Sequence, residues 1–244
     1  MARGKVDVEA FVAHTRRVVD ANATIRRRVA RETGIDVHLP YDYAWDVHER
    51  WLRHYQPREK GSLLFVALNP GPYGATQTGV PFTDVRTARS RLPKLGFDEE
   101  IPGRAPKSLR DLLVLTYERS SLCVYTMIDH GWGGPEAFGA DVCVFPYSPL
   151  LYVDRDRKPW NVTPEEARLR RRADLEEAFR ANVRGLLDIL APRGAVAVGR
   201  HAGERLPAAL PDGFPVVEVR HPAREPPKTW GRDVVKAIRA RGLL

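Results

Sequence analysis

Two segments of the sequence place an amide, an aromatic ring and an imidazole among Pro and Gly residues. The first, ALNPGPYGATQTGVPF at 67–82, holds Asn69 and ends at Phe82, and the second, RHPAREPPKTW at 220–230, holds His221. The first stretch excludes a regular helix or strand, because Pro lacks a backbone donor and Gly is costly to order. An amide, an imidazole and a ring together suit recognition of a flat heterocycle and stabilisation of a negatively charged leaving group.

Several other site chemistries lack their motifs. The loop at 69–82 has neither the GK[ST] of a phosphate-binding loop nor GxGxxG. None of the seven His stands in HExxH or another metal-ligand spacing, and GxSxG does not occur. Cys123 and Cys143 lie in apolar runs, are predicted to be buried thiols, and are too few for an iron–sulfur cluster. We therefore expect a site without a metal.

The composition is that of a globular protein with an anionic partner. The chain has 244 residues, long enough for one domain with a substantial core. Its formal net charge of +8 favours nucleic acid as a partner, although most basic residues are Arg, which a GC-rich genome would also produce. No apolar run is long enough to cross a membrane and no signal-peptide core is present. We expect a cytoplasmic monomer without a membrane association, nucleoid-associated if bacterial.

The hydrophobic pattern predicts that strands and helices alternate. Helices are expected at 7–33, within 39–56, within 83–107, over 108–132, at 163–192 with Thr163 as N-cap, and at 229–244. Strands are expected at 62–68, at 141–153 with breaks at Pro146 and Pro149, at 194–199 and at 214–222. This order predicts an α/β fold with a mainly parallel sheet under helices on both faces. Sites form at the carboxyl ends of such strands, so the loops at 69–82, 146–149 and 221–230 should converge.

These segments resemble the single-strand-selective monofunctional uracil-DNA glycosylases, a branch of the uracil-DNA glycosylase superfamily. LNPGPYGATQTGVPF is similar to the family's first motif, and RHPAREPPKTW is similar to its second. Three further blocks fall in the family's order: YDYAWDVHERWLRHY at 41–55, SPLLYVDRDRKPWNVTPEE at 148–166 and AVGRHAGERL at 197–206. The resemblance covers roughly 39–244, which makes 1–38 an N-terminal helical extension of a single domain spanning 1–244.

The resemblance implies a fold, an activity and a partner. The fold is a three-layer α/β/α sandwich on a short, mainly parallel central sheet. The activity is that of a monofunctional DNA repair glycosylase without a cofactor, which hydrolyses the N-glycosidic bond of uracil or a related damaged base and leaves an abasic site. The partner is DNA, single- or double-stranded, and the target base must leave the stack to be reached.

The first motif would then form the base pocket. By the resemblance, Phe82 stacks on the flipped ring and Tyr73 walls the pocket. Backbone amides near Gly74 and Ala75 hold the carbonyl oxygens of the base, and Gly71 permits close approach of the backbone. The alternative for Phe82 is a plain core position, since apolar rings are usually buried.

Catalysis and DNA contact would be divided between the two motifs. The resemblance implies that Asn69 orients the attacking water and that His221 hydrogen-bonds the departing base at O2. A turn-forming Asn and a structural His are the alternatives. The residues expected to contact DNA all belong to the second motif: Arg220, Pro222, Arg224 and Lys228. Of these, Arg224 would enter the gap left by the flipped nucleotide.

The sequence departs from the family at the second strand. There the family carries an Asn that reads the Watson–Crick edge of uracil, and the matching position before Pro149 is Pro146. Proline offers neither a side-chain amide nor a backbone donor. Tyr147 or Ser148 would supply a replacement hydroxyl, or backbone groups would read the base. The alternatives are a preference for hydroxymethyluracil, hypoxanthine or xanthine, or a catalytically silent protein that binds damaged DNA.

Overall fold

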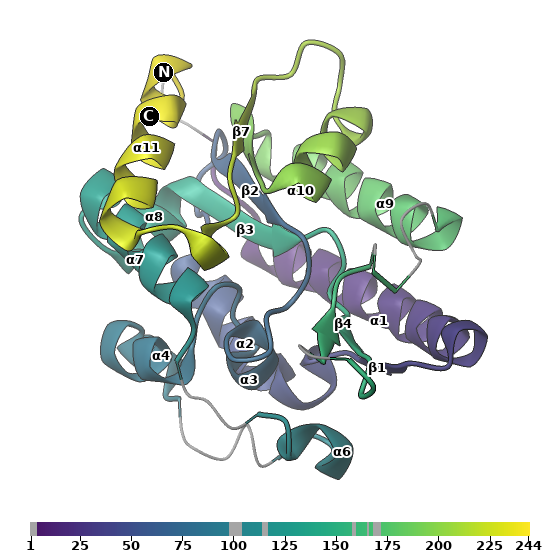
Figure 1. The fold of residues 1–244 in the computed structure, drawn as a ribbon. Helices are drawn as coiled ribbons and strands as arrows, with labels where there is room; N and C mark the ends of the chain where they lie inside the picture. Colours follow the sequence, from purple (N-terminus) through teal and green to yellow (C-terminus); the bar gives the residue numbers. More distant parts are fainter. Residues whose placement is uncertain (1–3, 98–103, 114–116, 158–159, 165, 168–171) are drawn as a thin grey trace.

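A four-stranded parallel sheet lies at the centre of the computed structural model, which describes residues 4–97, 104–113, 117–157, 160–164, 166–167 and 172–244 (Figure 1). The strand order is β3-β2-β6-β7, so β2, the first of these four strands in the chain, lies in the interior of the sheet. The strands are β2 (Leu63–Ala67), β3 (Val142–Pro146), β6 (Gly194–Val198) and β7 (Val216–Val219). All four predicted strands are present, and their parallel pairing brings their carboxyl ends to one edge.

Helices cover both faces of this sheet (Figure 1). On one face α7 (Arg119–Trp132) packs against α8 (Pro135–Asp141) and α11 (Pro227–Ala240), and on the other α1 (Val8–Thr33) packs along α9 (Ala173–Leu190). The strand side chains alternate accordingly, since Phe65 meets Phe138 of α8 whereas Phe145 meets Phe179 of α9. The predicted three-layer α/β/α sandwich is confirmed.

Other helices join these layers, including one turn at 75–78, within the segment 67–82 where no regular helix was expected. They are α2 (Tyr41–Tyr55), α3 (Ala75–Thr78), α4 (Val85–Arg91), α6 (Lys107–Arg110) and α10 (Arg200–Arg205), with single 3₁₀ turns η1 (Pro93–Leu95), η2 (Pro207–Ala209) and η3 (Pro222–Arg224). The predicted helices at 7–33, within 39–56 and at the chain end are confirmed; Asp7 caps α1 by accepting from the Ala10 N–H, and Gly34 ends it. Within the described residues, no helix combines the length and apolar character needed to cross a membrane.

A second, antiparallel sheet was not predicted from the sequence. It consists of β4 (Leu151–Val153) between β1 (Asp36–His38) and β5 (Asn161–Val162). The strand expected at 141–153 is therefore two strands in two sheets, separated by the segment with Pro146 and Pro149, where a proline cannot donate to a ladder. Residues 1–38 contribute both α1 and β1, and their description as an extension of the domain stays a prediction.

The predicted helix at 163–192 is wrong in its first part. The described helix α9 begins at Ala173, after Arg172. Thr163 instead closes a local turn: its Oγ1 accepts from the Glu166 N–H at 3.2 Å, and its own N–H donates to Glu166 Oε2 at 2.8 Å. This reciprocal pair is the same pattern that caps a helix, which explains the error. Residues 165 and 168–171 of the expected helix lie outside the described residues.

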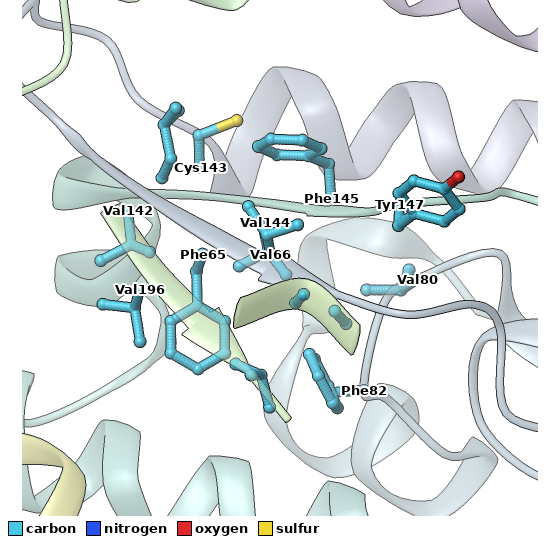
Figure 2. Packing of buried hydrophobic residues seen from close by; sticks show 14 of the residues in the cluster. Phe65, Val66, Val80, Phe82, Val142, Cys143, Val144, Phe145, Tyr147 and Val196 are labelled. Atoms are coloured by element: carbon cyan, nitrogen blue, oxygen red, sulfur yellow. The ribbon is translucent and has the colours of Figure 1, made fainter. Parts of the chain in front are cut away.

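The hydrophobic core continues from the sheet into the first motif. Figure 2 shows Val80 and Phe82 beside Phe65 and Val66 of β2. The Phe82 ring meets the Phe65 ring edge to face, with 6.0 Å between centroids. The Phe82 backbone has a φ of 54°, in the left-handed region that a bulky residue adopts only when its surroundings impose it. Packing in the core therefore fixes the end of this loop.

Helix α2 holds the middle of the same loop. His48 is buried, and its Nδ1 is 2.7 Å from the carbonyl oxygen of Gly79, so Nδ1–H donates to it. Gly79 has a φ of 72°, and a Cβ there would lie 2.9 Å from Ala44, so no larger residue fits. The Tyr43 hydroxyl donates to the Thr76 carbonyl at 2.7 Å. Burial lowers the pKa of His48 to about 4.

The buried His48 predicts an acid-sensitive fold. Its folded pKa lies below the unfolded value, so acid protonates the unfolded chain first and stability falls as pH drops below about 6.5. From about pH 7 to about pH 5 this one group should cost about 2 kcal/mol. Asn at this position keeps a donor for Gly79 but does not titrate. Urea unfolding at both pH values should show a smaller pH dependence for His48→Asn than for the wild type, and an equal dependence would contradict this account.

Candidate active site

A cavity of about 380 Å³ opens at the carboxyl edge of the parallel sheet. Every strand contributes to it: Ala67 from β2, Pro146 from β3, Val198 from β6 and His221 from the segment just after β7. The three loops singled out in the sequence therefore converge, as the parallel topology requires. Of the predicted site residues, those that line the cavity are Asn69, Gly71, Ala75, Phe82, Pro146 and His221.

Asn69 follows the end of β2 and faces this cavity. Its side chain is half-buried, and its Nδ2 is 3.4 Å from the Pro70 carbonyl oxygen, a long contact that leaves the amide free to bind elsewhere. Beyond it the loop closes on itself, because the Gly71 carbonyl accepts from the Thr76 N–H at 3.2 Å. The structure thus places an amide on a short, self-bonded loop at the end of a buried strand.

His221 is the N-cap of η3 and also lines the cavity. Its Nδ1 accepts a hydrogen bond from the Ala223 N–H at 3.3 Å, so the neutral ring carries its proton on Nε2. The ring is open to solvent at the cavity mouth, yet the surrounding protein desolvates it and lowers its pKa. Gly199 makes room for it, since a Cβ there would lie 3.3 Å from the His221 Cβ. His221 therefore presents a neutral Nε2–H donor at neutral pH.

Helices α7 and α11 hold the segment that carries His221. The Trp230 Nε1–H donates to the Arg220 carbonyl at 2.8 Å, and this bond connects the residue after β7 to α11. The Arg119 guanidinium of α7 donates to the Glu225 carbonyl at 3.1 Å. These bonds reach the backbone on both sides of His221, so its position depends on helices far away in the sequence.

Two predicted hydroxyls do not line the cavity. Tyr147 is buried, and its ring packs against Phe179 and His201 with centroids 4.8 and 4.7 Å away. In Figure 2 it lies on the side of the strands opposite Phe82. Ser148 is buried too, with its Oγ 2.9 Å from the Tyr152 hydroxyl. Their N–H groups donate to carbonyls of the β2 end, and this extends the β2–β3 pairing beyond Pro146.

The remaining predicted residues surround the cavity without lining it. The Tyr73 ring meets the Trp160 ring edge to face at 6.4 Å, and Gly74 lies against the carboxyl group of Glu118. The predicted DNA contacts have mixed exposure, since Pro222 is buried while Arg220, Arg224 and Lys228 are exposed. Arg220 forms an ion pair with Glu225 at 3.3 Å. The roles assigned to all of these residues stay predictions.

Both cysteines are free and buried, as predicted. The Cys123 Sγ is 3.4 Å from the Pro222 carbonyl oxygen, so this thiol packs under the η3 segment rather than facing solvent. Burial raises the pKa of the Cys143 thiol and of the Cys123 thiol, which keeps both protonated and unreactive. In the part of the chain that the structure describes, no group of His, Cys, Asp and Glu side chains is arranged to hold a metal ion.

Glu118 is a cavity residue that the sequence analysis missed. It immediately precedes α7. An acidic residue at such a position normally stabilises the helix through its dipole. Its carboxyl oxygens instead lie against Gly71 and Gly74, at positions that a Cβ on either glycine would occupy. Burial raises the pKa of its carboxyl to about 7. The nearby charge of Asp84 also raises this pKa, whereas a hydrogen bond with Ser120 lowers it.

Other lining residues were also not predicted to be site residues. They come from α2, from β5 and the residue after it, and from α10, and include Tyr41, Asn161, Thr163, Arg200 and His201. All five stand in the three further blocks that resemble the family, but nothing in those blocks pointed to the cavity before the chain was folded. The β4–β5 hairpin thus contributes to the site although neither of its short strands has enough residues for a periodic pattern.

Comparison with known proteins finds close counterparts along most of the chain. The single-strand selective monofunctional uracil DNA glycosylase of Bos taurus is 31% identical over 217 residues, which cover 85% of this chain and 78% of that protein. The proteins of the same name from Rattus norvegicus and Mus musculus are each 30% identical and have 76% of their length covered. The chain belongs to the single-strand-selective monofunctional uracil-DNA glycosylase family. No general protein-family profile matches it.

A solved structure supports the fold of this glycosylase. The crystal structure of wild-type Pedobacter heparinus SMUG2 superposes with a TM-score of 0.63 and covers 86% of this chain and 89% of that one. The two sequences are 20% identical, so this likeness concerns the fold alone. It agrees with the three-layer sandwich on a parallel sheet described above.

The tether between α11 and the His221 segment predicts a selective loss of activity. Trp230→Phe keeps the ring but removes the bond to Arg220, so stability should fall by about 1 kcal/mol and the base-excision rate by roughly tenfold. Trp132→Phe is the matched control, because its Nε1–H donates to Asp141 at 3.0 Å, outside the cavity lining. Urea unfolding and single-turnover excision should show similar stability losses but a rate loss for Trp230→Phe alone. Equal rates in the two variants would contradict the tether.

Proposed function

We propose that this glycosylase hydrolyses the N-glycosidic bond of uracil flipped out of DNA, and that it does so in the cavity at the carboxyl edge of the sheet. The observation that carries the proposal is the convergence there of Asn69, Phe82 and His221, in a chain that belongs to a uracil-DNA glycosylase family. The product is an abasic site in DNA and the free base.

The reaction needs positioning more than it needs a strong base. The bond between the sugar C1′ and the base nitrogen breaks, and its electron pair moves onto the base. A water molecule then forms a bond to C1′ and releases a proton, while the departing base takes one up. The Asn69 amide lies on a short loop at the end of β2, where it can orient that water.

His221 stabilises the charge that develops on the leaving base. Its neutral ring offers Nε2–H as a donor to O2 of the base, because Nδ1 is occupied by the Ala223 N–H. The lowered pKa keeps the ring in this form at neutral pH, so no proton has to be lost before catalysis. A preorganised donor of this kind contributes about 10²–10³ in rate.

Phe82 supplies the stacking surface for the flipped ring. It lines the cavity, and its strained backbone and its contact with Phe65 hold the ring in place before DNA binds. Stacking on a fixed ring is tolerant of base type, so Phe82 alone does not select uracil. Selection must come from polar groups around the base edge, where this chain has Pro146.

DNA would approach across the second motif. Arg220, Arg224 and Lys228 are exposed on the same segment that carries His221, where basic side chains can meet phosphates. Their sequence positions support insertion of Arg224 into the gap left by the flipped nucleotide. We expect the protein to work as a monomer in the cytoplasm, on single- or double-stranded DNA.

One assay tests the activity and the two catalytic assignments. Single- and double-stranded oligonucleotides with uracil, hydroxymethyluracil, hypoxanthine or xanthine are incubated with the protein, and abasic sites are cleaved with alkali. We expect product from uracil and a loss of about 10²-fold or more for Asn69→Ala and His221→Ala. His54→Ala, on an exposed position of α2, serves as the control and should match the wild type. No product from any base would refute the enzyme in favour of a silent DNA-binding protein.

Pro146 predicts how base selectivity responds to an added amide. Pro146 lines the cavity but offers no donor, so the Watson–Crick edge loses a contact worth about 1–3 kcal/mol. Pro146→Asn should raise the ratio of uracil excision to excision of the other bases in the same assay. An unchanged ratio would show that the β3 end does not face the base edge.

A further inference from the structure

We propose that Glu118 reads the target base by donating a hydrogen bond, as a neutral carboxylic acid, to a carbonyl oxygen of the flipped base. This inference rests on the proposed function, because it assigns a specificity contact to the same cavity. The neutral acid form makes Glu118 a donor to carbonyl-bearing bases rather than a general base for water.

The geometry places the carboxyl group at the base-binding wall. Glu118 lines the cavity together with Asn69, Phe82 and His221. Its two oxygens lie against Gly71 and Gly74, one on each, so the first motif approaches the carboxyl with bare backbone. A side chain on either glycine would displace it. The requirement for Gly at these two positions thus has a direct cause in this structure.

The backbone of Glu118 is fixed as firmly as its side chain. Its N–H donates to Asp84 Oδ2 at 2.9 Å, and the other Asp84 oxygen accepts from the Thr87 N–H at 2.8 Å. Asp84 is buried, with 1% of its surface exposed. It therefore anchors the backbone at Glu118, and its charge acts against ionisation of the Glu118 carboxyl.

The surroundings of Glu118 favour the protonated form. Burial is the main cause that raises its pKa to about 7, and the charge of Asp84 acts in the same direction. A hydrogen bond with Ser120 acts against them. The titratable or charged groups that share the cavity with Glu118 are Tyr41, Arg200, His201 and His221. Because His221 is neutral at neutral pH, it adds no positive charge that would ionise the carboxyl.

A neutral carboxyl can replace the amide that this chain lacks. Like a primary amide, it carries a hydrogen-bond donor and a carbonyl acceptor, whereas a carboxylate only accepts. Pro146 removes the amide expected at the β3 end, and neither Tyr147 nor Ser148 lines the cavity. Glu118 lines the cavity beside the first motif, and its protonated form can supply a donor to a base carbonyl.

This donor role predicts a pH profile that Gln changes. As pH rises through about 7 the wild-type carboxyl ionises, loses its proton and repels a carbonyl oxygen. Glu118→Gln keeps an N–H donor at every pH. The rates of single-turnover uracil excision are therefore compared for the two proteins. The Glu118→Gln rate divided by the wild-type rate should rise by up to about tenfold per pH unit above pH 7. Glu136→Gln, at an exposed position of α8, is the control and should follow the wild type.

Two results would overturn the proposal. One is a Glu118→Gln rate that stays a constant fraction of the wild-type rate from about pH 6 to pH 9. The other is a folded Glu118→Gln protein without activity at any pH, which would mean that the carboxylate acts as a base. Wild-type protein that releases no base at any pH would instead refute the proposed function, and the two failures are thus distinguished.

A binding measurement keeps the test independent of catalysis and of the Gln variant. The ligand is DNA that carries a fluorinated deoxyuridine, which resists cleavage. Calorimetry of its binding to the wild-type protein is done at about pH 8 in buffers of different ionisation enthalpy. The difference between buffers gives the number of protons that the complex takes up. We expect uptake approaching one proton, because the ionised carboxyl must be protonated to donate. Glu118→Gln should take up fewer protons. Proton release or no uptake by the wild type would contradict the donor role.

Discussion

The parallel pairing of β2 with β3 and β6 is the constraint on which the rest of the site depends. It places the ends of these strands at one edge, and the N–H groups of Tyr147 and Ser148 extend the β2–β3 ladder past the last regular pair. Proline at position 146 is tolerated at this point because it ends the strand. Any slip of β3 against β2 would move the cavity wall that Pro146 forms.

On this frame the functional loop is held by tertiary contacts rather than by its own sequence. His48 fixes Gly79, the Phe65 ring fixes Phe82, and the carboxyl of Glu118 fills the space over Gly71 and Gly74. The glycines therefore serve two purposes. Some allow left-handed backbone, and others leave room for a side chain from another element. A loop built this way is ordered before it binds a base, which reduces the cost of binding.

Local patterns in the sequence predicted much of this structure. The four strands of the parallel sheet are short apolar runs, and the Pro- and Gly-rich loops that follow them converge as parallel topology requires. The resemblance in the two motifs supplied the candidate roles of Asn69, Phe82 and His221. The start of α9 was misplaced because the Thr163–Glu166 pair closes a turn with the same chemistry that caps a helix.

Features made by long-range contact were not predictable in this way. Glu118 looks like an ordinary acid beside a helix start, and only the folded chain packs its carboxyl against the first motif and its backbone beside Asp84. The strands of the second sheet, two or three residues long, are too short to show a period. The most direct test of the account is a crystal structure with DNA that carries a cleavage-resistant deoxyuridine. We predict the base stacked on Phe82, with O2 at the His221 Nε2 and its other carbonyl oxygen at Glu118; a base bound outside this cavity would contradict the account.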